Sequence, residues 1–475
     1  MLLVLIHVLI TIVIAAIVFW IIDKYVRPPA LEPAEDSRHS DLPRRHTAAG
    51  IAAYRRRPLA SSRMSAEDYH PFVPAPGQSA IAGPTPRTHA KARTRSPRAQ
   101  ELFGTWAKLA AEPFQGITTE GRVQHGLFSL SPQDAPTLAM IETVNALLGI
   151  LTPAQRAALC LPVNSELWRH WQNTELYVEH HGLRLDEAGA TVQEAVMAVL
   201  RTSLSHKGYG IARGVMQLNR FLGDLVGGPA VLGEWAYTFC LFGTPSDSEP
   251  WGWQLFGHHL SLNCFVIGRQ MVLTPCFFGA EPNYADAGPF AGTRLFEDEE
   301  RAGLALMRSL SAGQRQQAIV AHAMMGGDLP DGRRHFADNL HLGGAFQDNR
   351  IVPYEGLRAS TLSARQQRDL MALVEAYVAP LPPGPLDARL TEVERHLADT
   401  HFCWIGGFAE TSPFYYRIQS PVIFIEFDHH AGVFLTNAEP AKFHVHTIVR
   451  TPNGNDYGID LLRLHYQQAG HHRHG

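Results

Sequence analysis

The residues best suited to chemistry lie near the carboxyl end of the chain, in the segment 442–450, KFHVHTIVR. In an extended strand successive side chains point to opposite faces, so His444, His446 and Arg450 share one face while apolar residues occupy the other. Two imidazoles on one strand face direct nitrogen atoms at a common point, a recurrent way of binding divalent transition metals. The segment therefore predicts a site for Zn²⁺, Fe²⁺ or Mn²⁺ with His444 and His446 as ligands.

A carboxylate on the preceding apolar segment is the expected third ligand. Glu426 and Asp428 alternate with apolar residues in VIFIEFD, and a hydrophobic strand does not ordinarily bury a carboxylate without a partner. If this strand pairs with 442–450, Glu426 completes the ligand set and Arg450 is placed to hold an anionic group of a substrate. The alternative is that these histidines and carboxylates satisfy one another in a structural network without a metal.

A further histidine comes from the segment 253–268, whose pattern predicts one continuous strand. Alternation along it groups His259 with Ser261 and Asn263 on a polar face and leaves His258 among apolar residues. His259 is therefore expected to be an additional metal ligand or a general base, whereas His258 is expected to be a hydrogen-bonded core residue.

These segments must be positioned by the elements around them. Helical periodicity dominates from residue 100 to residue 227, and helical runs return between residues 297 and 398. Alternating patterns predict five strands, at 236–243, 253–268, 270–278, 414–429 and 442–450. Helices and mostly antiparallel strands segregated in this way indicate an α+β fold, with a largely helical first half packed on the sheet.

Three helical runs are preceded by a hydroxyl residue suited to capping the first turn, namely Thr152, Ser311 and Ser363. Such a recurrence would fit an internal repeat. Because the lengths between the three segments differ and no other motif recurs, we interpret the likeness as repeated capping chemistry.

The amino-terminal region has a different character from the rest. Leu2–Ile22 is an apolar run long enough to cross a bilayer, with no basic residue before it, so residues 1–26 are expected to form an uncleaved membrane anchor. Lys24 and Arg27 follow the run and favour a single-pass topology with the domain in the cytoplasm, and export is the alternative. Residues 27–99 are rich in Pro and Arg and are expected to be a disordered basic linker.

Composition excludes several classes of protein. A net charge of −4 gives no reason to expect nucleic acid as a partner. The five cysteines are scattered without CxxC spacing, which argues against a disulfide framework or a zinc finger. Nucleophile elbow, Walker A, HExxH and dinucleotide-binding motifs are missing as well. The domain is assigned to residues 100–470, and the histidine-rich tail 471–475 is left out of any site.

Several separated blocks of the chain carry a family resemblance: WGWQLFGHHLSLN, TPCFFGAEP, FQDNRIVPYEG, FYYRIQSPVIFIEFD and HVHTIVRTPNGNDYGIDLLRLHY. Through them the region from about Ala99 to Gln468 resembles domain of unknown function 3500 (DUF3500). The resemblance implies that the blocks carrying His258, His259, Glu426, His444, His446 and Arg450 form one recurring pattern, but it implies no activity.

The residues together favour a membrane-tethered, metal-dependent enzyme acting on an unknown small molecule. Hydrolysis is favoured over oxygen chemistry, because a metal held by three protein groups leaves a position at which water is activated. The alternative is a non-catalytic ligand-binding or scaffold protein.

Overall fold

The computed structural model describes residues 67–471. The expected anchor Leu2–Ile22 lies outside the described residues, as do the first part of the expected linker and all but the first residue of the histidine-rich tail. None of the helices in the described region has both the length and the apolar character needed to cross a membrane.

The domain begins earlier than the pattern of the sequence predicts. Residues 67–99, expected to belong to the linker, contain α3 (Pro86–Arg93) and the first residues of α4 (Pro97–Ala110). Tyr69 is fully buried, and its ring packs against those of Phe221, Tyr284 and Phe443. Buried Tyr69 and His89, together with the contact of Phe72 with Phe443, thus fix a segment whose composition is otherwise that of a flexible linker.

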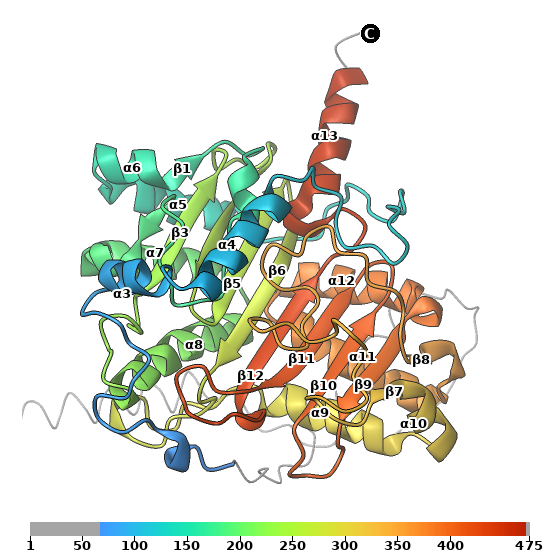
Figure 1. Ribbon diagram of the computed structural model, residues 1–475. Helices are drawn as coiled ribbons and strands as arrows, with labels where there is room; N and C mark the ends of the chain where they lie inside the picture. Colours follow the sequence, from blue (N-terminus) through green and yellow to red (C-terminus); the bar gives the residue numbers. More distant parts are fainter. Residues whose placement is uncertain (1–66, 472–475) are drawn as a thin grey trace, which may run out of the picture. The chain divides into compact units, whose positions relative to one another are not determined.

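One large, mostly antiparallel sheet runs through the molecule (Figure 1). From edge to edge it contains β1 (Cys160–Leu161), β3 (Tyr237–Phe242), β4 (Trp251–Gly257), β5 (Leu260–Ile267), β6 (Gln270–Ala280), β12 (Ala441–Arg450), β11 (Phe424–His430), β10 (Phe414–Gln419), β9 (His401–Gly406) and β7 (Ile319–Ala321). The short strands β2 (Leu183–Arg184) and β8 (Leu357–Arg358) pair with β3 and β9. The expected combination of helices with a mostly antiparallel sheet is confirmed.

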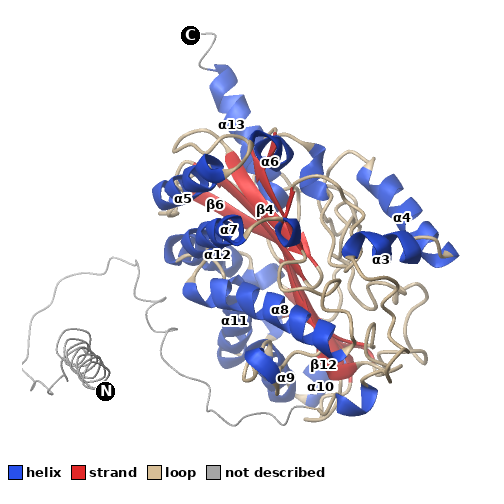
Figure 2. Ribbon diagram, turned by 90° about the vertical axis from the view of Figure 1, so that its left-hand side faces the viewer, coloured by secondary structure: helices blue, strands red, loops and turns tan. Residues whose placement is uncertain are grey.

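Helices cover one face of the sheet, and long loops with α3 and α4 cover the other (Figure 2). The helical layer contains α5 (Thr137–Ile150), α7 (Ala190–Ser203), α8 (His206–Leu225), α9 (Glu297–Ser309), α11 (Ala364–Val378) and α12 (Pro383–Arg395), and the remaining helices are α6 (Pro153–Leu159), α10 (Ala312–Ala318) and α13 (Ile459–His471). Phe443, Val445 and Val449 of β12 belong to the main core, whereas Ile448 belongs to a separate aromatic cluster. The alternation predicted for β12 is therefore confirmed.

The described chain is an internal duplication. Its elements follow the order α5, α6, β1, β2, α7, α8, β3, β4, β5, β6, and then the same order as α9, α10, β7, β8, α11, α12, β9, β10, β11, β12. Within the sheet the second set is arranged in reverse, so that β6 and β12 meet antiparallel at the centre. The two copies are thus related by an approximate two-fold rotation about the β6–β12 pair.

The short strands β2 and β8 pair at equivalent positions in the two copies. Leu183 pairs with Phe239 in the first copy, and Leu357 pairs with Phe402 in the second. Gly182 and Gly356, which precede these short strands, both have a φ of +82°, a conformation that favours glycine. A Cβ on either glycine would collide with the cysteine of the neighbouring strand, Cys240 or Cys403. The interpretation of the recurrent segments as capping alone is therefore wrong.

The capping residues themselves are confirmed. Thr152, Ser311 and Ser363 each form a capping box with a glutamine three residues later. Thr152 and Ser311 occupy equivalent places in the two copies, before α6 and α10.

Two of the expected strands are each divided into a hairpin. The segment 253–268 turns at His258 and His259 between β4 and β5, and Gly257 pairs with Leu260 across that turn. The segment 414–429 turns at Ser420–Ile423 between β10 and β11, where the Ile423 carbonyl accepts a hydrogen bond from the Ser420 amide. Pro421 explains the second break, because proline cannot donate to the hydrogen-bond ladder of a central strand.

Candidate metal centre

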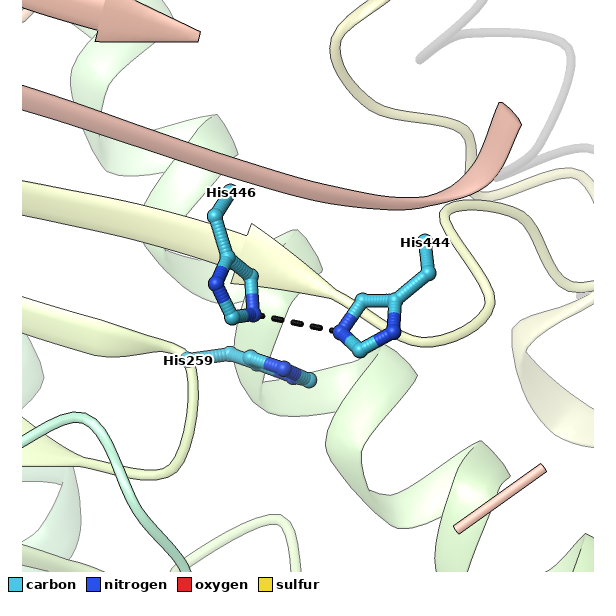
Figure 3. A group of neighbouring side chains, drawn as sticks. All are labelled: His259, His444 and His446. Carbon is cyan, nitrogen blue, oxygen red and sulfur yellow. Dashed lines mark hydrogen bonds between the residues drawn. The ribbon is translucent and has the colours of Figure 1, made fainter. Parts of the chain in front are cut away.

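Three buried imidazoles converge where the ends of β12 and β6 meet the β4–β5 turn (Figure 3). His259, His444 and His446 each offer one nitrogen atom, and these nitrogens all lie within 4.8 Å of one another. The Nε2 atoms of His444 and His446 face each other at 3.1 Å. Burial lowers the pKa of all three rings well below the usual range, and neighbouring histidines lower it further. The rings are therefore neutral near pH 7, which is the form that binds metals.

The tight turn between β4 and β5 positions His259. Its φ of +62° is left-handed, a conformation that histidine adopts more readily than most residues. Its amide donates to the Asn173 carbonyl at 3.1 Å, and its carbonyl accepts from the Gly279 amide at 2.7 Å. These bonds hold a strained residue in place, and strain of this kind is concentrated at functional sites. The sequence pattern predicts that His259 lies on the polar face of a continuous strand. In the structure it enters the group from a turn instead.

His258 forms its hydrogen bond outside the group, as its apolar neighbours predict. Its Nδ1 atom lies 2.7 Å from Oδ1 of Asn219, and Asn219 donates in turn to the Gly233 carbonyl. The oxygen of Asn219 can only accept, so Nδ1 of His258 carries the proton. The ring is 4% exposed and stacks on that of His259 at 3.8 Å.

The segment 431–440 orients His444. Nδ1 of His444 lies 2.9 Å from the Ala431 carbonyl, which can only accept, so this nitrogen carries the proton and Nε2 presents its lone pair to the group. Glu281 anchors the segment by accepting backbone hydrogen bonds from Val433, Phe434 and Leu435. Burial raises the pKa of Glu281 to about 7, against the opposing effect of these bonds. Segment 431–440 connects β11 to β12 in the second copy. The equivalent connection in the first copy, between β5 and β6, is much shorter and contains only Gly268 and Arg269.

Gly279 leaves room for the three rings. It pairs with His446 across the β6–β12 ladder, and an added Cβ would lie 2.9 Å from Cδ2 of His446 and 3.0 Å from Cδ2 of His259. Real Cβ atoms are not found so close to neighbouring atoms, so any side chain here would push the two imidazoles apart. The backbone is thus adapted to the histidine group.

Replacing Gly279 with alanine is expected to weaken metal binding by about 10-fold or more, the effect typical of disturbing groups that orient metal ligands. The measurement is competition for zinc with a chromophoric chelator. Gly313→Ala is the matched control, because a Cβ there meets nothing within 4 Å. Equal zinc affinities for the two variants would contradict a site built around these rings.

Glu426 does not complete the ligand set. Its strand does pair with β12, but Glu426 lies opposite Ile448, whereas Asp428 lies opposite His446. The Glu426 carboxylate accepts from the Leu342 amide at 2.9 Å and from the Tyr415 hydroxyl at 2.6 Å. Burial opposes its ionisation, yet His341 and these hydrogen bonds keep its pKa below the usual range. Glu426 is therefore a structural anion that holds the covering loop, and His259 is the third member of the group instead.

Arg450 is also engaged elsewhere. Its Nε donates to Asp456 at 2.7 Å, its Nη2 to Asp348 at 2.5 Å and its Nη1 to the Gly343 carbonyl at 2.8 Å. The side chain is fully buried. All three guanidinium nitrogens therefore have protein acceptors. The sequence pattern predicts that Arg450 holds a substrate, but the structure does not place it to do so.

His430 is a neighbour of the group that sequence reasoning missed. Its ring centroid lies 4.6 Å from that of His444 and 4.3 Å from that of His446. Its Nδ1 donates to the Ala431 carbonyl at 2.8 Å, while its buried Nε2 has no hydrogen-bond partner. Burial lowers its pKa to about 4. The sequence does indicate His430, because the alternation that groups Glu426 with Asp428 on one strand face continues to this residue.

Comparison with known proteins gives one result. The family described as "Protein of unknown function (DUF3500)" matches residues 133–459, which include both copies of the duplicated unit. No curated protein and no solved structure matches the chain.

Proposed function

The chain belongs to the DUF3500 family, and on that premise we propose that it is a metal-dependent enzyme with His259, His444 and His446 as ligands of a divalent transition ion. One observation carries the proposal. Three buried imidazoles converge, and two of them bring their Nε2 atoms to 3.1 Å, close enough for one ring to donate a hydrogen bond to the other. When both rings carry their proton on Nδ1, as His444 does, both Nε2 lone pairs face the same point and are available to a metal ion.

The donor set suits zinc, iron or manganese. Three imidazoles without a carboxylate or thiolate resemble the ligand sets of catalytic zinc sites, in which a fourth position is left open. An ion held in this way lowers the pKa of a water molecule toward neutrality, which favours hydrolysis, and iron would instead support oxygen chemistry. We favour hydrolysis. The unpartnered Nε2 of His430 would accept a hydrogen bond from a group at the open position.

Metal content tests the proposal directly. Protein purified without an affinity tag and without residues 471–475 is expected to hold about one equivalent of a transition metal, because its three-imidazole site is buried and preformed. A His444→Ala, His446→Ala double variant is expected to lose it, measured by plasma mass spectrometry. Content far below one equivalent and unchanged in the double variant would contradict the proposal. The buried polar network would then fit a non-catalytic binding or scaffold protein better than an enzyme.

We also propose that Leu2–Ile22 tethers the chain to a membrane as a single-pass anchor, with the domain in the cytoplasm. The support is the apolar run and the basic residues Lys24 and Arg27 that follow it. A reporter that is active only in the cytoplasm, fused after Gly475, is expected to be active in the membrane fraction. Activity of an export-dependent reporter at the same position would contradict the cytoplasmic assignment.

A further inference from the structure

Two buried arginines, about two strands away from the histidine group, lack acceptors for part of their guanidinium groups. Arg333 is 7% exposed and Arg417 is 1% exposed. Arg333 donates through Nη1 to the Leu340 carbonyl, while its Nε and Nη2 have no partner. Arg417 donates through Nη2 to the Pro353 carbonyl at 3.1 Å and forms an ion pair with Glu355 at 2.9 Å, while its Nη1 has no hydrogen-bond partner. Buried donors without acceptors are costly and uncommon.

The two guanidinium groups lie around one side chain, Tyr415. Tyr415 and Arg417 are two residues apart on β10 and so share a face of the sheet. The guanidinium carbon of Arg333 lies 4.7 Å from the centre of the Tyr415 ring. The two positive charges are near enough to repel each other, which is unfavourable unless an anion lies between or beside them.

The nearby carboxylates do not neutralise Arg333. Among the described residues no carboxylate lies within ion-pair distance of it, and Glu426 is taken up by backbone amides and the Tyr415 hydroxyl. Asp428 accepts a hydrogen bond from the Leu340 amide at 3.4 Å and, among the described residues, forms no ion pair with either arginine. Two nitrogens of Arg333 and one of Arg417 therefore remain without a protein acceptor, although Glu355 and Glu426 lie nearby.

The arginines are connected to the histidine group by a row of polar residues. Tyr415, Asp428 and His446 lie directly opposite one another on the adjacent strands β10, β11 and β12. Neighbouring strands are about 4.8 Å apart, so Tyr415 and His446 are separated by about 10 Å. Unpartnered buried atoms recur along this row and in the loop above it, namely Oδ1 of Asp428, Oδ1 of Asn339, Nε2 of His341 and Nε2 of His430.

We propose that Arg333 and Arg417 bind an oxyanion, either a carboxylate or a phosphate group. Both groups accept the paired N–H bonds that a guanidinium offers. In the enzyme proposed above, this oxyanion is part of the substrate, and its reacting bond lies toward the histidines about two strands away. The substrate is then a small anion whose polar groups also meet Asp428 and His341. That assignment rests on the proposed function, whereas the binding of an oxyanion does not.

Calorimetric titration of the full-length chain with inorganic phosphate, and separately with acetate, tests the inference. Saturable binding of phosphate indicates a phosphate site, and preference for acetate indicates a carboxylate site. Arg333→Gln is expected to lower the affinity for the preferred anion at least 10-fold, with partial recovery in Arg333→Lys. Arg333 is preferred to Arg417 for the test because it forms only one hydrogen bond with the protein.

Arg358→Gln is the matched control, because Arg358 lies in the same copy but forms an exposed ion pair with Asp399. The inference is overturned if the native chain binds neither anion, or if Arg333→Gln binds as tightly as Arg358→Gln. Repeating the titration with a strong chelator separates the two proposals. Anion binding that persists after the metal is removed supports the oxyanion site. A protein that holds no metal before chelation but binds an anion contradicts only the metal enzyme, and a metal-loaded protein that binds no anion contradicts only the oxyanion site.

Discussion

Replacing Arg450 with methionine is expected to lower the free energy of unfolding by about 3 to 5 kcal/mol, the loss typical of removing one partner from a buried ion pair. Arg450 is fully buried and pairs with both Asp348 and Asp456. Without it, buried Asp456 loses its guanidinium partner, and Asp348 keeps only Arg169, at 2.9 Å, and the Tyr457 hydroxyl, which donates to it at 2.9 Å. The cost arises mainly from leaving Asp456 buried without a cation, and not from the loss of an attractive contact.

Equilibrium unfolding in urea measures this loss. Arg358→Met is a suitable control because its ion pair with Asp399 is about half exposed, and such pairs contribute about 1 kcal/mol or less. If Arg450→Met were as stable as the control but inactive, the interpretation of Arg450 as a structural residue would fail, and a direct role with substrate would have to be reconsidered.

Zinc is expected to stabilise the protein by about 4 kcal/mol when its free concentration is 1,000 times its dissociation constant. The reason is linkage, because the three imidazoles are brought together only in the folded chain, so the ion favours that state. His446→Ala removes one ligand and should abolish most of this gain. Thermal unfolding with and without zinc measures the effect, and His125→Ala, which removes an exposed histidine, is the control. Equal stabilisation of the two variants would assign the effect to binding elsewhere.

The sequence predicts the side chains of the site better than their partners. Alternation along 442–450 places His444 and His446 on one face, and the structure agrees. Alternation cannot give the register between strands, and a shift at His429 and His430 changes it locally. The assignment of Glu426 depended on that register. Its actual partners, the amides of Leu342 and Gly343, come from a distant loop with no periodic pattern.

Other features were missed because their signals are short. The duplication recurs in sequence mainly as Gly-Leu-Arg at 182–184 and 356–358 and as Phe-Cys-x-x-Gly at 239–243 and 402–406, motifs too brief to separate from chance. The turn at His258 and His259 lacks the glycine or asparagine that usually marks a hairpin. The fold class required less information, because helical and alternating patterns extend over whole elements.

Because of the duplication, the histidine group lies between two copies of one unit, as a site at a subunit interface does, but within a single polypeptide. His259 comes from the first copy, and His444 and His446 come from the second, so the group spans the junction formed by β6 and β12. A symmetric homodimer would build such a junction site twice. Here β6 contains no histidine, nor does the Ser420–Ile423 turn equivalent to His258–His259. Fusion of two copies has thus allowed them to diverge, and the chain carries one centre that neither copy could form alone.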